Sequence, residues 1–169
     1  MAKEIINEER NEIEVLGFSV KNSCFGINIE KIQEIVINKK ITSIPCAPKG
    51  IIGMFQVRDG IYNVIDLEWI LFGEKAIIDK DVFYILCNFE GKNYAFVVHN
   101  VSSIIKEEKD NISKVPEILT KGGAINITGI IRAENTLISI LDVEKIVKNI
   151  GHFEEVLDEK LLKEIEKTK

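Results

Sequence analysis

An internal repeat constrains the fold of this chain more than any other feature of its sequence. Residues 53–71 recur without a gap as residues 129–147, at an offset of 76 positions. A second stretch, residues 25–36, recurs as residues 94–105 at an offset of 69 positions, and its large apolar positions are kept. Because two stretches repeat in the same order, we infer that the chain arose by duplication of one module.

The longer repeat predicts a hairpin followed by a short helix. Asp59 and Gly60 lie between two apolar runs rich in β-branched residues. An Asp-Gly pair in this setting favours a two-residue turn with positive φ at both residues. Asp66 stands at the expected N-cap of a helix over residues 67–72, which Gly73 should end. Asp142 is the corresponding cap in the second copy.

The shorter repeat predicts a strand followed by one helical turn. Alternating apolar residues are typical of a half-buried strand. Over residues 30–36 the period lengthens, so we expect Ile32, Ile35 and Val36 to form the apolar stripe of a single turn. The residues expected to fill the interior of the modules are Phe25, Ile27, Ile29, Phe96 and Val98.

Short strands and tight turns predict an all-β fold with minor helices. Apolar residues make up 46% of the 169 residues, which is enough for a sizeable core. Roughly five short strands per copy close most economically into a small barrel, so we expect two five-stranded barrels. We place the first copy at about residues 15–74 and the second at about 82–148, and leave open whether strands are exchanged between them.

The two ends of the chain differ from the repeats. Residues 1–14 are charged and aperiodic, which indicates a flexible leader. Residues 152–169 carry apolar residues at helical spacing among Glu and Lys, which predicts an amphipathic helix. This helix either caps the barrels or binds a partner. Its apolar residues are Phe153, Val156, Leu157, Leu161, Leu162 and Ile165.

Composition and motifs argue against several classes of function. The net charge of −5 makes nucleic acid a poor partner. No apolar run approaches the roughly 18 residues that a membrane-inserted helix needs. The three scattered cysteines suit a reducing cytoplasm. His99 and His152 lie far apart, and we find no catalytic constellation, metal-ligand cluster or cofactor-binding motif, so we expect a protein that is not an enzyme.

One pair of opposite charges stands out as a candidate recognition element. Glu34 is flanked by the apolar Ile32, Ile35 and Val36, and Arg58 is placed at the tip of the predicted hairpin. We infer an ion pair between Glu34 and Arg58. As a surface salt bridge it would contribute only about 0–1 kcal/mol to stability. Beside an apolar groove it would serve partner recognition instead, since arginine and apolar anchors concentrate binding energy.

The order and spacing of several motifs resemble the CheW family of chemotaxis coupling proteins, over about residues 15–147. In the first copy these are Phe25-x-Ile-x-Ile-x-x-Ile-Gln-Glu-Ile, Ile41-Thr-x-Ile-Pro45, Pro48, Gly53, Val57-Arg58 and Val64-Ile65-Asp66-Leu67. In the second they are Val98-x-x-Val101, Val115-Pro116, Gly129 and Leu141-Asp142. We therefore divide the chain into a leader (1–14), a CheW-like domain (15–151) and a C-terminal helix (152–169).

The resemblance implies two SH3-like β-barrels and a non-enzymatic adaptor. In this family the adaptor joins the cytoplasmic tips of methyl-accepting chemotaxis receptors to the regulatory domain of the histidine kinase CheA. It is cytoplasmic and associated with membrane receptor arrays. The family's binding positions fall on Ile32, Glu34, Ile35, Gly53 and Arg58 of this sequence.

The sequence departs from the family pattern at Asp59, Asn63 and His99. These departures leave room for a divergent paralogue that serves another signalling complex. A small-ligand-binding β-barrel is the alternative from a different class of function. The bulky residues expected to point inward argue against it, because they should fill a small barrel.

Overall fold

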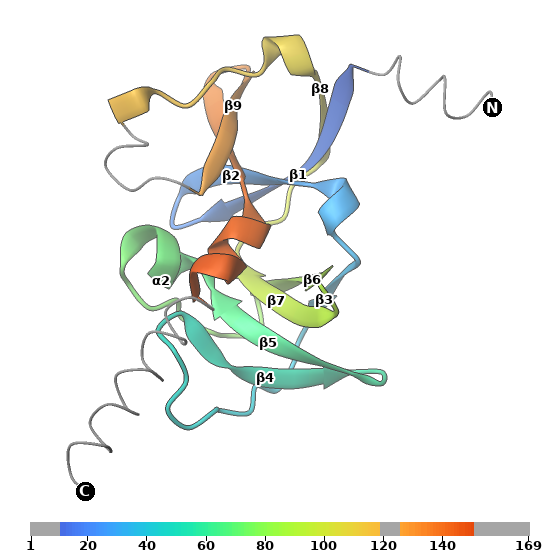
Figure 1. The fold of residues 1–169 in the computed structure, drawn as a ribbon, viewed down its shortest axis with the longest axis vertical. Helices are drawn as coiled ribbons and strands as arrows, with labels where there is room; N and C mark the ends of the chain where they lie inside the picture. Colours follow the sequence, from blue (N-terminus) through green and yellow to red (C-terminus); the bar gives the residue numbers. More distant parts are fainter. Residues whose placement is uncertain (1–10, 119–125, 151–169) are drawn as a thin grey trace, which may run out of the picture.

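Over residues 11–118 and 126–150, which the computed structural model describes, ten strands form two five-stranded sheets. Sheet A, with the order β8-β1-β2-β10-β9, lies in the upper part of Figure 1, and sheet B, with the order β3-β6-β7-β5-β4, in the lower part. The predicted all-β fold class is confirmed. The strands are β1 (Glu12–Val20), β2 (Ser23–Asn28), β3 (Glu34–Ile37), β4 (Ile51–Val57), β5 (Gly60–Asp66), β6 (Phe83–Phe89), β7 (Lys92–Val98), β8 (Ile104–Glu108), β9 (Ile127–Ala133) and β10 (Thr136–Leu141).

Short helical segments connect the strands. They are η1 (Ile29–Lys31), which carries the chain from sheet A to sheet B, α2 (Leu67–Phe72) and η2 (Lys109–Asn111). Residues 143–150 are also helical. The predicted C-terminal helix over residues 152–169 lies outside the described residues, as do the first ten residues of the predicted leader.

Each sheet contains strands from both copies of the repeat. Strands β1 and β2 of the first copy join β8, β9 and β10 of the second. In sheet B, β5 runs parallel to β7 with Asn63 opposite Tyr94, and in sheet A β10 runs parallel to β2 with Ser139 opposite Phe25. These two pairings are related by the same offsets, 76 and 69, that relate the sequence repeats. The hairpin of each copy therefore pairs with the strand of the other.

We call residues related by these offsets counterparts. The offset of 69 extends to β1 and β6, because Val15 pairs with Asn28 as Tyr84 pairs with Val97. It also relates the two hairpin turns that follow these strands, where Lys21 and Asn22 have φ of 50° and 67° and Glu90 and Gly91 have φ of 54° and 78°.

The two repeated glycines occupy similar surroundings. A Cβ at Gly53 would lie 2.3 Å from the Thr42 carbonyl oxygen, and one at Gly129 would lie 2.5 Å from the Ile112 side chain. At each site a connecting segment crosses the hairpin, through the bridges Thr42–Met54 and Ser113–Ile130. Glycine is required at both positions because the crossing chain approaches so closely.

Both predicted helix caps are confirmed. Oδ1 of Asp66 accepts a hydrogen bond from Trp69 N at 3.1 Å, and Oδ1 of Asp142 accepts one from Lys145 N at 3.1 Å. The helix α2 ends at Gly73, whose φ is 74°. Asp66 is also buried, and its Oδ2 accepts a second hydrogen bond from Ala76 N at 2.8 Å. This carboxylate therefore anchors the segment that links the two copies.

Three local predictions were wrong. The β4–β5 turn is centred on Arg58 and Asp59, because Val57 pairs with Gly60, and this register turns Phe55 and Val57 inward. Residues 34–37 form β3 instead of a helical turn, because their backbone pairs with β6. The predicted leader over residues 1–14 was too long, since β1 begins at Glu12 and its residues 12–14 pair with β8.

The interior is divided into three apolar clusters. The largest is shared between the sheets, and each sheet encloses a smaller one of its own. Phe25, Ile27, Phe96 and Val98 belong to the shared core, and Ile29 packs against it. The prediction that these residues fill the barrels was therefore wrong. Because β2 and β7 are buried on both faces, their alternation did not reveal which face points into which cluster.

Candidate partner-binding surface

The predicted ion pair between Glu34 and Arg58 is confirmed. Nη1 of Arg58 lies 3.0 Å from Oε2 of Glu34, and Nη2 lies 3.2 Å from Oε1, so the guanidinium holds both carboxylate oxygens. The Arg58 side chain is 77% exposed and that of Glu34 35% exposed. An ion pair this exposed contributes only about 0–1 kcal/mol to stability.

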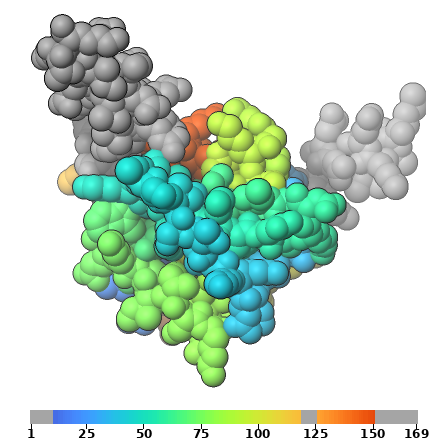
Figure 2. Space-filling model, turned by 90° about the horizontal axis from the view of Figure 1, so that it is seen from below, coloured from blue at the N-terminus to red at the C-terminus, as the bar shows by residue number. Residues whose placement is uncertain are grey.

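The fold brings these two side chains together from opposite edges of sheet B. Glu34 begins β3, at one edge of sheet B, and Arg58 stands at the tip of the hairpin formed by β4 and β5, at the other edge. The pair therefore links the two edges of the sheet. In Figure 2 the blue segment that includes β3 and the teal segment that includes β4 lie next to each other on this side of the molecule.

The duplication supplies an internal control for this pair. The counterparts of Glu34 and Arg58 are Ser103 and Glu134, which cannot form an ion pair. Sheet A nevertheless forms with the same strand arrangement. The positive φ of Arg58, 54°, also belongs to the hairpin geometry, since Glu134 has φ 53°. The fold therefore does not require this pair of charges.

Exposed apolar side chains lie on the elements that carry the ion pair, but on the other face of sheet B from Glu34, whose pairing partner Leu86 belongs to the interior of that sheet. Ile35 is 37% exposed, Ile37 52% and Ile61 60%. Ile35 pairs directly with Ile85, a shared-core residue, so it lies on the face of sheet B that packs against sheet A. Ile32 is half-buried and packs against the shared core. Apolar surface on this face of sheet B therefore extends beyond the area that sheet A covers.

Gly53 occupies a different place from the other predicted site residues. It is buried in β4 against the Thr42 carbonyl oxygen. The structure brings Glu34 and Arg58 together, with Ile32 and Ile35 next to Glu34 along the chain, but it does not bring Gly53 to the surface. Its contribution to a binding surface would be through the path of the backbone.

Two contacts of the surface had no signal in the sequence. Oη of Tyr62 donates to Oε1 of Gln33 at 3.2 Å and links β5 to the residue before β3. Nε2 of Gln56 donates to the Arg58 carbonyl oxygen at 3.0 Å. Neither periodicity nor spacing marks these residues, because the first contact forms only when the sheet curves and the second depends on the geometry of the β4–β5 turn.

The described residues offer little for catalysis or metal binding. In residues 11–118 and 126–150 no three His, Cys, Asp or Glu side chains gather where they could hold a metal ion. Burial raises the pKa of the Cys87 thiol to about 12, so it stays protonated and unreactive. No helix within these same ranges is long and apolar enough to cross a membrane.

Comparison with known proteins identifies the class to which this fold belongs. The CheW-like domain family matches residues 14–151. The chain therefore belongs to the CheW-like domain family, whose members are non-enzymatic scaffold proteins of chemotaxis.

Individual relatives agree with this assignment. The chain is 30% identical over 145 residues to the chemotaxis protein CheW of Helicobacter pylori, covering 83% of this chain and 86% of that protein. It is 24% identical to CheW of Treponema pallidum, covering 83% and 84%. The crystal structure of the scaffolding protein TtCheW from Thermoanaerobacter tengcongensis superimposes with a TM-score of 0.68 at 26% identity, covering 76% of this chain and 83% of that one.

Proposed function

We propose that this protein couples the cytoplasmic tips of chemotaxis receptors to the histidine kinase CheA. In this role it works in the cytoplasm at membrane receptor arrays and holds its partners together without chemistry of its own. The observation that carries the proposal is the exposed Glu34–Arg58 pair, which the fold does not need and which is formed by elements that also carry the exposed Ile35, Ile37 and Ile61.

The chemistry of this surface suits protein recognition. Arginine with exposed aliphatic neighbours is typical of the centres of protein–protein interfaces, where apolar burial supplies affinity and charge supplies orientation. Glu34 holds the guanidinium in one place, so less side-chain entropy is lost on binding. We assign receptor contact to the side of the molecule that carries Ile32, Ile35, Glu34 and Arg58. Gly53 acts indirectly, by keeping β4 close to residues 41–42.

The test is a charge reversal with a matched control. Arg58→Glu places two carboxylates together and should weaken binding to purified CheA or to a receptor tip by about tenfold or more. The control is Glu134→Arg, which reverses the charge at the counterpart position in sheet A and should leave the affinity unchanged. Both variants should keep the circular dichroism spectrum of the original chain.

Isothermal titration calorimetry with each partner separates the outcomes. Loss of binding in the Arg58 variant alone supports the assignment of the surface. Wild-type affinity of that variant for both partners would refute the surface. Absence of binding by the unaltered chain to either partner would refute the proposed function itself.

A further inference from the structure

The interiors of the two sheets differ in size at counterpart positions. Sheet B encloses an aromatic pair, Phe55 and Tyr84, whose ring centroids are 5.1 Å apart. Their counterparts in sheet A are Ile131 and Val15. The same trend holds at five further inner positions of sheet B, whereas Val64 and Val82 have the larger counterparts Ile140 and Ile13. Leu86, Ala95, Val97, Val57 and Tyr62 correspond to Gly17, Gly26, Asn28, Ala133 and Ile138 in sheet A.

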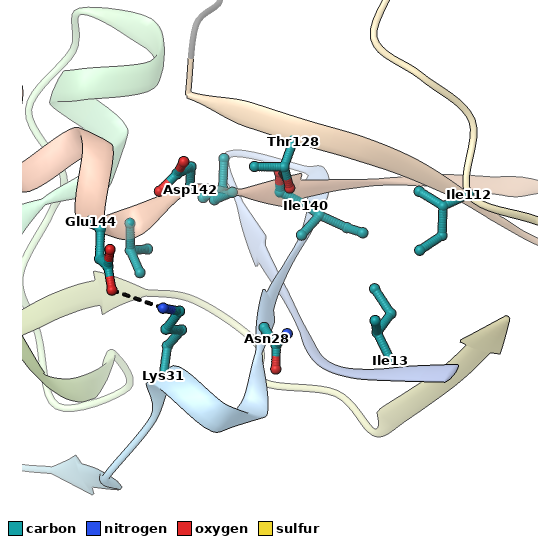
Figure 3. A pocket seen from close by; sticks show the side chains of 10 residues that line it. Ile13, Asn28, Lys31, Ile112, Thr128, Ile140, Asp142 and Glu144 are labelled. Carbon is teal, nitrogen blue, oxygen red and sulfur yellow. Dashed lines mark hydrogen bonds and ion pairs between the residues drawn. The ribbon is translucent and has the colours of Figure 1, made fainter. Parts of the chain in front are cut away.

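A cavity of about 330 Å³ opens at one end of sheet A (Figure 3). Its apolar wall is formed by Ile13, Ile112 and Ile140, and Asn28 and Thr128 add polar groups. The counterparts of Asn28 and Thr128 in sheet B are Val97 and Ile52, which pack in or against the interior of that sheet. The cavity thus lies where polar residues replace the apolar filling of the other copy.

The entrance to the cavity carries more negative than positive charge. Nζ of Lys31 lies 2.8 Å from Oε1 of Glu144 (Figure 3), and Asp142 also lines the opening. The hydrogen bond between them raises the pKa of Lys31 and lowers the pKa of Glu144, so both are charged at neutral pH. Lys31 is engaged by Glu144, and Oδ1 of Asp142 accepts the hydrogen bond from Lys145 N that caps the helix, which leaves Oδ2 of Asp142 to face a ligand.

A second hollow next to this cavity also has more acidic than basic side chains in its lining. It shares Ile13 and Asn28 with the cavity and adds three acidic and two basic side chains. One acid and one base of this set are joined in the ion pair between Glu14 and Lys106. The charged residues that the hollow adds are Glu12, Glu14, Glu30, Lys106 and Lys109. Negative charge therefore prevails on both sides of the opening and would attract a cation.

We propose that this cavity binds a small molecule with an apolar body and an ammonium head. The volume matches the lower end of the range of small-molecule sites, roughly 300–1,000 Å³, and is too small for an element of a folded partner. The body lies against Ile13, Ile112 and Ile140, and the head lies at Asp142. No residue of β3 or of the β4–β5 hairpin lines this site, so it adds a ligand to the proposed function.

A series of three matched probes tests the proposal on the full chain. The probes are hexylammonium, 1-hexanol and hexanoate, which share one apolar body and differ in the charge of the head. We expect hexylammonium to bind about tenfold more tightly than hexanoate, with hexanol between them, because the carboxylates favour the cation. Affinities come from chemical-shift titrations by NMR. Failure of all three probes to bind the full chain overturns the proposal, and so does equal affinity for the cation and the anion.

Two substitutions locate the site. Thr128→Ile introduces the residue that sheet B has at the counterpart position, so it should fill the opening and abolish hexylammonium binding without lowering the melting temperature. Asp142→Asn keeps a helix cap, since asparagine also caps well. It should remove the preference for hexylammonium over hexanol while hexanol still binds. Unchanged hexylammonium affinity in both variants would place the ligand elsewhere and refute the site.

Discussion

The two sheets share one backbone plan but use it differently. Sheet B has an aromatic interior and displays the Glu34–Arg58 pair on its surface. Sheet A has an aliphatic interior, an open cavity, and Ser103 and Glu134 at the corresponding surface positions. The features that agree are backbone features, namely the close-approach glycines and the helix caps. The two copies thus share the residues that fix the backbone path, while the interior and surface side chains of each sheet have diverged.

The largest loss of stability should follow when an interior residue of sheet B is replaced by its counterpart from sheet A. Tyr84→Val introduces the residue of the counterpart, Val15, and removes the ring that packs against Phe55. We expect a loss of about 3 kcal/mol in the free energy of unfolding, because a cavity replaces a buried aromatic ring. Urea denaturation measures it. Leu137→Ala, at an exposed position of sheet A, is the control and should change stability by less than about 0.5 kcal/mol. A loss for Tyr84→Val as small as that of the control would show that the two interiors do not differ in packing.

The two helix caps should differ by a smaller amount. Asp66→Ala removes two hydrogen bonds to a buried carboxylate, whereas Asp142→Ala removes one to a half-buried carboxylate. We expect losses of about 2–3 kcal/mol for Asp66→Ala and about 1 kcal/mol for Asp142→Ala. Thermal and urea unfolding of both variants check the ranking. Equal losses would mean that anchoring the linking segment at Ala76 adds nothing to stability.

The ion pair between Lys31 and Glu144 gives a weaker, pH-dependent effect. The pKa of Glu144 is lowered from 4.5, so its contribution is present above that value and is lost as pH falls through the folded-state pKa. The pKa of Lys31 is raised from 10.5, so its contribution is present below that value and is lost as pH rises through the folded-state pKa. Lys31→Met should therefore cost about 0.5 kcal/mol at neutral pH.

Comparing the urea stability of Lys31→Met and the original chain across pH tests this account. The difference between them should shrink as pH falls below 4.5, the ordinary pKa of Glu144. A difference that stays constant down to complete protonation of the carboxylates would mean that packing of the lysine stem, and not its charge, accounts for the effect.

Local features could be predicted from the sequence, whereas long-range pairing could not. The caps at Asp66 and Asp142 depend on residues within one helical turn, so their spacing alone was sufficient. Strand β3 was mistaken for a helical turn because its conformation depends on pairing with β6, about fifty residues away in the chain. The register of the β4–β5 turn was likewise set by which face of the hairpin had to be buried.

The same contrast between local features and long-range pairing applies to the candidate sites. Glu34 and Arg58 could be paired in advance, because Glu34 is flanked by apolar residues and Arg58 stands at the tip of the predicted hairpin. The cavity of sheet A could not be predicted, because its lining residues Asn28 and Thr128 come together only when β2 and β9 pair on either side of β10.

The central claim is that the Glu34–Arg58 pair exists for recognition and not for the fold. A charge-swap cycle tests it most directly, with calorimetric titration of a purified receptor tip into Glu34→Arg, Arg58→Glu and the double variant. The double variant restores an ion pair of opposite direction. We expect it to melt within about 2–4 °C of the original chain, as a surface pair of at most about 1 kcal/mol implies, yet to bind as weakly as the single variants. Recovery of the original affinity in the double variant would contradict the claim, because it would show that the pair acts only by holding the surface together.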